Sequence, residues 1–256
     1  TITWNVSNRP MNVMNVDTMN AYGEAVDKAV DDENVKGVIV ASAHKEFVVG
    51  ADLSVMGDGD LSMLEEFMQV VHGKFRRMET SGKPFVAAIN GHALGGGFEL
   101  CLSCHHRIAA DNPKTKIGLP EAKIGLLPGG GGTQRLPRMI GMQQALPLML
   151  EGRELAPAAA LNMGMVDAVV PADELLAAAK AWVLGDGQKN KVQPWDKKSF
   201  KMPGGAVQSA TGQQAFAAGN AMLHQRTYGN YPAQQNIMSC FYEGCQVDID
   251  TGLAIE

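Results

Sequence analysis

Two glutamates, Glu99 and Glu121, stand in the kind of sequence that can support proton transfer. Each has apolar neighbours and lies next to glycine-rich sequence, with glycines at 95–97 before Glu99 and at 129–132 after Glu121. Two carboxylates at the ends of neighbouring apolar elements can take a proton from water and give one to a substrate. If they share an apolar pocket, at least one pKa should rise, which suits a proton donor. Sequence spacing alone does not bring them together, and Glu99 in a first helical turn could equally stabilise that helix.

The backbone near these glutamates could bind a ligand through its amide groups. Residues 88–100 combine a buried strand, the glycine run and a helix start, so free amides at the start of the helix could face a ligand. The segment matches neither the dinucleotide-binding fingerprint nor the phosphate-binding P-loop, and close packing of helix against strand is the alternative. The apolar loop at 47–53 could present further amides or be an ordinary buried turn. Lys45 beside it could be a solvated charge or a partner for a phosphate.

The sequence Cys101-Leu102-Ser103-Cys104-His105 matches the attachment pattern for c-type haem. Such attachment requires export, and the N-terminal sequence offers no export signal. Two thiols in an apolar helix are ordinary core residues. His105 and His106 could complete a zinc set, but no second Cys or His pair follows at zinc-finger spacing. We therefore predict no haem and no metal site here.

The composition indicates a large buried core and narrows the classes of protein. The 256 residues are 45% hydrophobic, which predicts one large domain or one domain with an appendage. The 22 basic against 27 acidic side chains give a net charge of −5, which excludes the broad basic field of sequence-independent nucleic-acid binding. No apolar run approaches the roughly 18 to 20 residues of a membrane span. Four cysteines are too few for a disulfide scaffold, and we expect a soluble, intracellular protein.

The elements that must position the glutamates alternate between apolar strands and amphipathic helices. This alternation predicts an α/β layered fold. The polar stretch 185–205 predicts a connection, followed by a helical tail from Ala206. Asp17 is the expected N-cap of the first helix. Strands are predicted at 37–41, 84–90, 106–110, 116–118 and 165–170, and helices after Asp17, at 61–80, after Gly97 and at 132–150, 156–163 and 173–184.

Three segments carry a family resemblance: 47–53 (FVVGADL), 88–100 (AINGHALGGGFEL) and 117–138 (IGLPEAKIGLLPGGGGTQRLPR). In their order and spacing they resemble the crotonase superfamily, over most of the chain. Within that superfamily the sequence most resembles the enoyl-CoA hydratase part of multifunctional fatty-acid oxidation enzymes. The turn at 111–115 and the sequence PWDKK at 194–198 are features of that branch.

The resemblance implies a crotonase-like spiral of strand-strand-helix (ββα) turns with a C-terminal helical region that covers the site. It implies a hydratase core at 1–185 and, at 186–256, a linker and helical extension leading to a dehydrogenase part that these residues do not include. Neither the spiral nor this division follows from periodicity. We expect the chain to be the N-terminal part of a longer enzyme.

The resemblance also implies roles for site residues. The amides of Ala51 and Gly96 match an oxyanion hole for a thioester carbonyl, where enolate charge develops. Glu99 and Glu121 match the carboxylates that flank the alkene, with Glu99 holding and deprotonating water and Glu121 giving a proton to the α-carbon. The Gly129 amide helps to place the water. Contacts to the coenzyme A thioester are expected from Lys45, Val49, Gly50, Asp52, Leu53, Gly95, Pro120 and Pro128.

The implied function is addition of water to trans-2-enoyl-CoA, giving 3-hydroxyacyl-CoA in fatty-acid β-oxidation. No cofactor is expected, because the coenzyme A thioester is itself the substrate. The alternatives are an enoyl-CoA isomerase, which shifts the double bond, and a non-catalytic acyl-CoA binding or assembly domain. The implied setting is an oligomer, or a larger complex with dehydrogenase and thiolase parts, in the bacterial cytoplasm rather than the mitochondrial matrix. The sequence does not predict the acyl-chain length or the oligomeric state.

Overall fold

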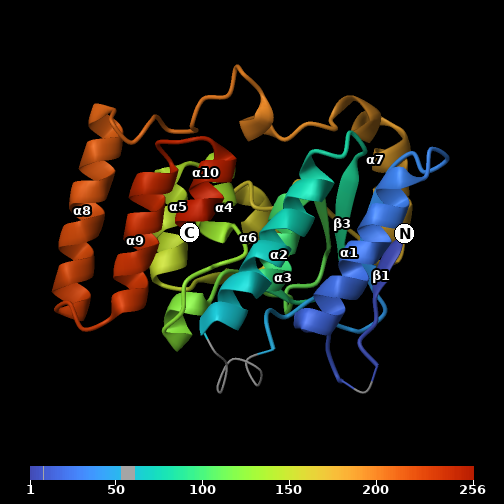
Figure 1. Ribbon diagram of the computed structural model, residues 1–256, viewed down its shortest axis with the longest axis horizontal. Helices are drawn as coiled ribbons and strands as arrows, with labels where there is room; N and C mark the ends of the chain where they lie inside the picture. Colours follow the sequence, from blue (N-terminus) through green and yellow to red (C-terminus); the bar gives the residue numbers. More distant parts are fainter. Residues whose placement is uncertain (8, 53–60) are drawn as a thin grey trace.

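The main sheet is the centre of the molecule. The computed structural model describes residues 1–7, 9–52 and 61–256 (Figure 1). Within this part of the chain, one sheet is wholly parallel, in the order β1 (Ile2–Trp4), β2 (Val38–Ser42), β3 (Phe85–Ile89), β5 (His106–Ala110) and β8 (Ala168–Val170). A smaller sheet joins β4 (Ala93–Leu94), β6 (Ile117–Gly118) and β7 (Glu154–Leu155), with β6 and β7 antiparallel.

The central strand β3 shows why this sheet forms. All five of its residues are buried, as expected of a strand covered on both faces. Phe85, Ala87 and Ile89 belong to the larger core, whereas Val86 and Ala88 pack with α7 (Leu175–Leu184) in a second core on the opposite face. The short apolar run predicted as a buried strand is therefore confirmed.

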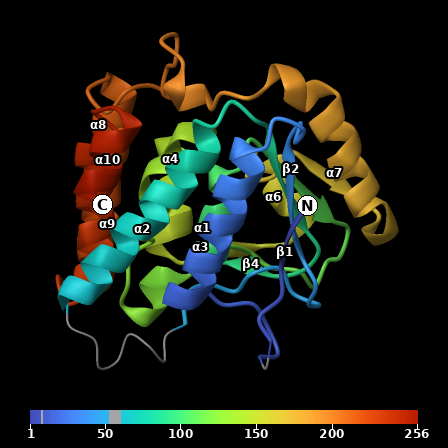
Figure 2. The same ribbon diagram turned by 45° about the vertical axis from the view of Figure 1, so that its right-hand side comes forward.

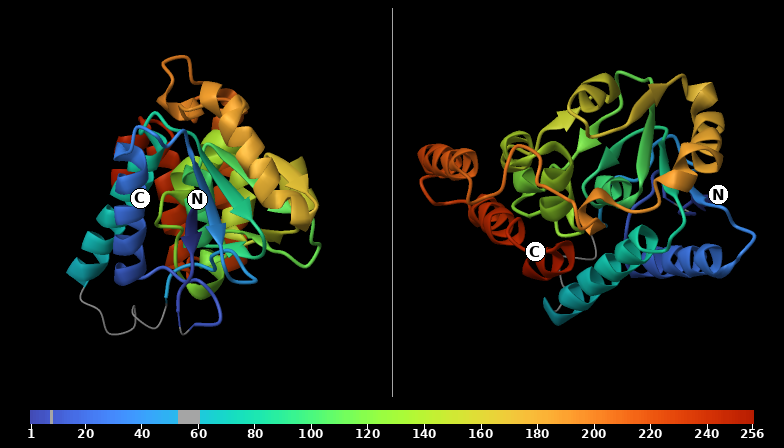
Figure 3. Two further views of the ribbon diagram at one scale, coloured as in Figure 1. Left: turned by 90° about the vertical axis from the view of Figure 1, so that its right-hand side faces the viewer. Right: turned by 90° about the horizontal axis from the view of Figure 1, so that it is seen from above.

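Helices cover both faces of the sheet. α1 (Val16–Asp31) and α2 (Leu61–Glu79) lie on one side and α7 on the other, as the turned views in Figures 2 and 3 show. The predicted N-cap of α1 was wrong by two residues. Asn15 caps the helix, because its side chain accepts a hydrogen bond from the Thr18 amide while the Thr18 hydroxyl accepts one from the Asn15 amide. Asp17 lies in the first turn instead.

The segment predicted as one helix at 132–150 forms two, α4 (Gly132–Ile140) and α5 (Met142–Leu150). They meet at Gly141, whose φ of +85° is incompatible with a continuous helix. The helix α6 (Pro157–Asn162) follows β7. The strand predicted at 165–170 was too long, because Met165 and Val166 are buried in the larger core before β8 begins. The helix predicted at 173–184 begins as a 3₁₀ turn at Ala172–Glu174.

The C-terminal helices gather at the end of the molecule opposite the N-terminus (Figure 1). After 3₁₀ turns at Asp186–Lys189 and Pro194–Asp196 come α8 (Ala210–Thr227), α9 (Pro232–Gly244) and α10 (Ile249–Ile255). The predicted connection and helical tail are thus present. α10 packs against α9 and α4. None of the helices described is both long enough and apolar enough to cross a membrane.

A network of ion pairs, fully buried at Glu79 and Arg135, ties α2 to α4 and to the C-terminal region. The guanidinium of Arg135 donates to both carboxylate oxygens of Glu79 at 2.7 and 3.0 Å, with both side chains fully buried. Arg76 also donates to Glu79 at 2.8 Å, and to Asp196 and Asp250 at 2.8 and 2.7 Å. Glu79 therefore forms ion pairs with two guanidinium groups at once.

Glu79→Gln should lower the free energy of unfolding by about 3 to 5 kcal/mol, because it leaves the buried Arg135 charge without its partner. The unfolding midpoint of the purified protein measures this effect. Glu151→Gln is the matched control, since Glu151 pairs with Arg226 at the surface, with side chains 36% and 58% exposed. Its loss should cost less than about 1 kcal/mol. Equal effects of the two changes would contradict the inference that the buried Glu79–Arg135 pair matters more to the free energy of unfolding than the exposed pair does.

Candidate active site

A cavity of about 390 Å³ opens between α2, the loop at 48–51 and the helix starts that follow β4 and β6. Its walls are mainly apolar side chains, as is usual in binding sites for small molecules. The apolar side of α2 supplies one wall. The residues that line the cavity are Met14, Val49, Gly50, Ala51, Phe67, Met68, Val71, His72, Leu94, Gly95, Gly96, Glu99, Pro120, Glu121, Ile124, Leu126, Leu127, Gly129, Gly130 and Glu256.

Two backbone segments with unused amides face each other in this cavity. Residue Gly96 begins the helix α3 (Gly96–Ser103), and a Cβ built on it would lie 3.9 Å from the Ala51 nitrogen. Met14 fixes the loop that carries Ala51, because its amide donates to Gly50 at 2.8 Å and its carbonyl accepts from Asp52 at 2.8 Å. Among the described residues, neither the Ala51 amide nor the Gly96 amide has a backbone acceptor. Both can donate to a ligand oxygen.

Glu99 lies on α3 with only 3% of its surface exposed. Its Oε1 accepts hydrogen bonds from the Gly130 and Gly132 amides at 2.8 and 2.7 Å. A Cβ on Gly130 would come within 2.6 Å of the carboxylate and one on Gly132 within 2.8 Å, which explains the glycines at these positions. Burial raises the pKa of Glu99 well above its usual value, as do the charges of Glu121 and Glu256, while the two amides oppose the rise.

Glu121 begins the 3₁₀ turn η2 (Glu121–Ile124) that follows β6, and its side chain is buried. Its Oε2 has no hydrogen-bond partner among the described residues, so it is available to a ligand. Burial raises the pKa of Glu121 to about 7, and the nearby charge of Glu256 adds to the rise. Two carboxyl groups with raised pKa values in one apolar cavity suit proton transfer near neutral pH.

The remaining residues predicted to contact substrate divide into two groups. Val49, Gly50, Gly95 and Pro120 line the cavity, as does Gly129, whose carbonyl lies 2.7 Å from Nε2 of His72. Three others do not line it, namely the exposed Lys45, the buried Pro128 and Asp52, whose carboxylate accepts from Arg9 at 2.7 Å. Leu53 lies outside the described residues.

The structure adds residues to the cavity that the sequence did not single out. Met14, which lies just before α1, and His72 of α2 both line the cavity. Glu256, which follows α10, lines it as well. Phe67, Met68 and Val71 of α2 also line it. Glu256 follows Leu253-Ala254-Ile255. A carboxylate beside apolar residues was the signal that marked Glu99, and the same signal could have marked Glu256.

The residues of the haem-like pattern belong to the core. Cys101 and Cys104 are buried, and burial raises the pKa of Cys104 to about 12, so its thiol is neutral. The Nδ1 atom of His105 accepts a hydrogen bond from the Phe85 amide at 3.1 Å. Its Nε2 lies 3.2 Å from the Glu79 carbonyl. Both ring nitrogens are therefore engaged with the backbone around β3 and α2.

Gly95→Ala should lower catalytic turnover at this site about 10²-fold, the cost typical of a misplaced reacting group. Gly95 has a φ of +54°, which strains any residue with a Cβ, and the added methyl would meet Oε1 of Glu121 at 2.8 Å. Gly73→Ala is the control, because a Cβ there in α2 meets nothing within 4 Å. Steady-state kinetics of both variants checks this expectation, and an active Gly95→Ala protein would contradict the close approach of Glu121.

The fold and this cavity define an enzyme class known from solved structures. An enoyl-CoA hydratase from Bacillus anthracis is 27% identical and superimposes with a TM-score of 0.66, covering 99% of this chain and 82% of that one. The fold is also that of the human mitochondrial Δ3-Δ2-enoyl-CoA isomerase, with a TM-score of 0.67 at 24% identity and coverage of 99% and 91%. The predicted crotonase-like α/β fold with a helical C-terminal region is confirmed.

The chain belongs to the enoyl-CoA hydratase/isomerase family, whose model matches residues 2–185. It is 37% identical over 259 residues to the fatty acid oxidation complex subunit alpha of Shewanella halifaxensis and 38% identical over 260 residues to that of Shewanella loihica. Each match covers the whole chain but 36% of the relative. The chain thus spans about a third of the length of these curated relatives.

Proposed function

We propose that this cavity catalyses the reversible addition of water to a trans-2-enoyl-CoA, giving a 3-hydroxyacyl-CoA. One observation carries the proposal: Glu99 and Glu121 are both buried, and they line the same cavity as Ala51 and Gly96. Membership of the enoyl-CoA hydratase/isomerase family supports this class of reaction. The mainly apolar walls are suited to an acyl chain.

The amides of Ala51 and Gly96 act on the thioester carbonyl in this proposal. Attack of water at the β-carbon moves electrons through the conjugated system onto the carbonyl oxygen, which gains enolate charge. Two fixed amide donors stabilise that charge more in the transition state than in the substrate. Loss of one such donor typically costs about 3 kcal/mol of barrier.

Glu99 acts as the base and Glu121 as the acid. The amides of Gly130 and Gly132 that donate to Glu99 favour its charged form, whereas the Glu121 carboxylate accepts a backbone bond from its own amide alone and its Oε2 has no partner among the described residues. On this difference in hydrogen bonding we assign the single proton of the active pair to Glu121, although burial and the charge of Glu121 also raise the pKa of Glu99. Glu99 takes a proton from water as the water oxygen bonds to the β-carbon, and Glu121 gives its proton to the α-carbon. Return of one proton from Glu99 to Glu121 through solvent restores the pair, and the step requires no cofactor.

Turnover of crotonyl-CoA by the purified full-length protein tests the proposal. Loss of the ultraviolet absorbance of the conjugated thioester, with a product heavier by one water, is the expected result. A β,γ-unsaturated thioester is offered in parallel. Conversion of that substrate to the conjugated isomer without any hydration would identify an isomerase, and binding of both thioesters without turnover would identify a non-catalytic domain. Either result would contradict the proposed hydratase.

The relatives named above are subunits of a fatty acid oxidation complex, and we extend that setting to this chain. Its proposed product is a secondary alcohol, which a dehydrogenase can oxidise to the ketone that a thiolase cleaves. A larger assembly with both activities is therefore the proposed partner. The four cysteines are all free thiols, which supports a reducing compartment such as the bacterial cytoplasm. Native mass spectrometry of the protein purified from its own cells tests the assembly.

A further inference from the structure

Glu256, at the end of α10, shares the start of α4 with Glu99. Its carboxylate accepts hydrogen bonds from the Gly131 amide at 2.5 Å, from the Thr133 amide at 3.0 Å and from the Thr133 hydroxyl. Glu99 accepts from the amides of Gly130 and Gly132. Successive amides at 130–133 therefore alternate between two carboxylates. Such amides at a helix start have no partner within the helix, and two buried anions satisfy them here.

The same segment is held through its carbonyl groups. Nε2 of His72 lies 2.7 Å from the Gly129 carbonyl and 3.4 Å from Oε1 of Glu256. A proton on Nε2 donates to the Gly129 carbonyl. Arg135 donates to the Gly130 carbonyl at 3.1 Å. Amide groups and carbonyl groups of the backbone at 129–133 thus both have hydrogen-bond partners. The Glu256 side chain is fully buried among these groups.

We propose that Glu256 is a positioning residue for the hydration reaction, which clamps the segment 129–133 so that Glu99 is aimed at the bound water. This inference rests on the proposed function. Without the Glu256 carboxylate, the buried amides of Gly131 and Thr133 lose their acceptor, and an unsatisfied buried donor drives a local rearrangement. The amides that orient Glu99 belong to the same segment. A shift of about 1 Å in a reacting group can cost about 10²-fold in rate.

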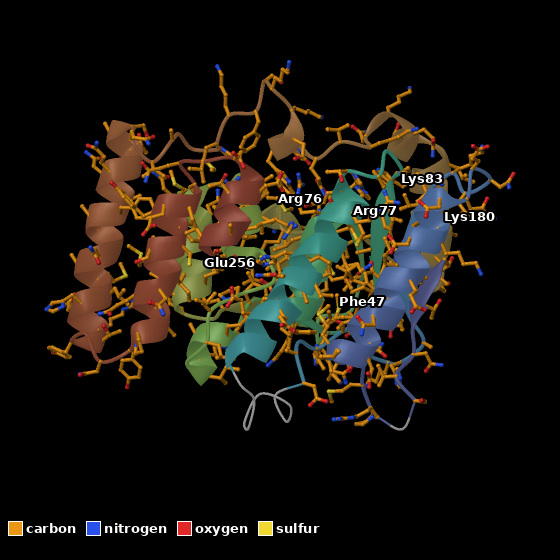
Figure 4. The ribbon with its side chains drawn as sticks, viewed as in Figure 1. Phe47, Arg76, Arg77, Lys83, Lys180 and Glu256 are labelled. Carbon is orange, nitrogen blue, oxygen red and sulfur yellow. The ribbon has the colours of Figure 1, made fainter. Side chains whose placement is uncertain are left out.

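An ion pair also links α2 to α10 beside the clamp. Asp250, in the first turn of α10, accepts from Arg76 at 2.7 Å, and Asp196 accepts from the same guanidinium. Figure 4 shows Glu256 between the C-terminal helices and α2. The C-terminal region therefore contributes a residue to the cavity rather than merely covering it.

Glu256 also carries a charge, so its removal should change the pH dependence of the reaction, which the loss of a purely structural residue would not do. The Glu256 carboxylate raises the pKa of both Glu99 and Glu121. The other ionisable groups that interact with it are His72 of α2, Arg138 of α4 and Cys240 of α9. Arg135 of α4 donates to the neighbouring Gly130 carbonyl. None of these other groups is itself altered when Glu256 alone is changed. Removal of its charge should therefore lower the pKa of Glu121.

Glu256→Gln, Glu256→Asp and the control Glu243→Gln, made in the full-length protein, test the inference. Glu243 is exposed on α9, so its change removes one charge from the same region without touching the cavity. Glu256→Gln should lower kcat roughly 30- to 100-fold with KM within about threefold. It should also move to lower pH the alkaline limb of the pH profile, that is, the fall in kcat/KM that we expect at high pH when Glu121 loses its proton. Glu256→Asp keeps the charge and should keep the limb in place. Wild-type kcat and limb in Glu256→Gln, or an equal limb shift in Glu256→Asp, would overturn the inference.

Amide hydrogen exchange of the peptide that contains 129–133 provides a readout that does not depend on activity. Exchange should be at least about tenfold faster in Glu256→Gln than in the wild type, because the amides of Gly131 and Thr133 use different oxygens of Glu256 and glutamine keeps only one acceptor oxygen. Glu243→Gln should show the wild-type rate. Unchanged exchange in Glu256→Gln would overturn the clamp even if the wild type hydrates crotonyl-CoA. If the wild type hydrates no enoyl thioester, the proposed function fails and so does the catalytic role of the clamp.

Discussion

Glu99→Gln is expected to reduce kcat for hydration of an enoyl-CoA about 10³-fold and to leave KM within a few-fold. Glutamine is nearly isosteric, and its Oε1 can still accept the amides of Gly130 and Gly132. The cavity should therefore keep its shape and bind substrate. The lost element is the base, because a neutral amide cannot take the proton from water. A fall in kcat without a matching rise in KM is the result expected when an interaction acts in the transition state.

The control for this variant is Glu66→Gln, which removes the same charge from an exposed position on α2. It should leave kcat within about twofold, in line with the small effects of most surface changes. Steady-state kinetics with crotonyl-CoA and the unfolding midpoint are measured for both proteins. A Glu99→Gln enzyme that is stably folded and has nearly the wild-type kcat would contradict the assignment of Glu99 as the base.

Local sequence patterns predicted the elements whose burial is set by their neighbours along the chain. The short apolar run of β3 favours a strand buried on both faces, and the apolar residues of α2 have the spacing of one helical face. The expected bounds of these elements differ from the observed ones by about one residue, which is the usual uncertainty at element ends. The approach of Glu99 and Glu121 to one cavity came from family resemblance, since nothing in their spacing requires it.

The features that sequence reasoning missed depend on contacts between distant segments. The break at Gly141 accompanies a close approach to the Pro203 carbonyl, which lies 2.8 Å from the position of a Cβ. Met14 joins the cavity because it bridges to Ala51. Glu256 joins it because α10 docks on α4 and α9. Each contact is decided by tertiary packing, and no local period or spacing in the sequence encodes it.

The pH dependence of kcat/KM should show the proton held by the glutamate pair. The pair must carry one proton to be active, both for hydration and for the reverse reaction, because each direction gives one proton and takes one. Burial raises the pKa of Glu121 to about 7. As pH rises through that value, Glu121 loses its proton and can no longer act as the acid. We expect kcat/KM to fall about tenfold per pH unit above this point in both directions, and a profile that stays flat to pH 9 would contradict this assignment.

Glu121→Gln should remove this limb together with most of the activity, lowering kcat about 10³-fold and leaving a residual rate that is independent of pH between about 6 and 9. We expect this residual rate to come from the amides of Ala51 and Gly96, the proposed oxyanion hole, which the change does not touch. Glu154→Gln, whose carboxylate pairs with lysines at the surface near β6, should keep both the rate and the limb. If Glu121→Gln kept the alkaline limb, the limb would belong to another group.

Because Glu256 raises the pKa of Glu121 through its charge, the same limb links the acid to the clamp on α4. A shift of the limb in Glu256→Gln and its disappearance in Glu121→Gln would together place both residues in one electrostatic unit.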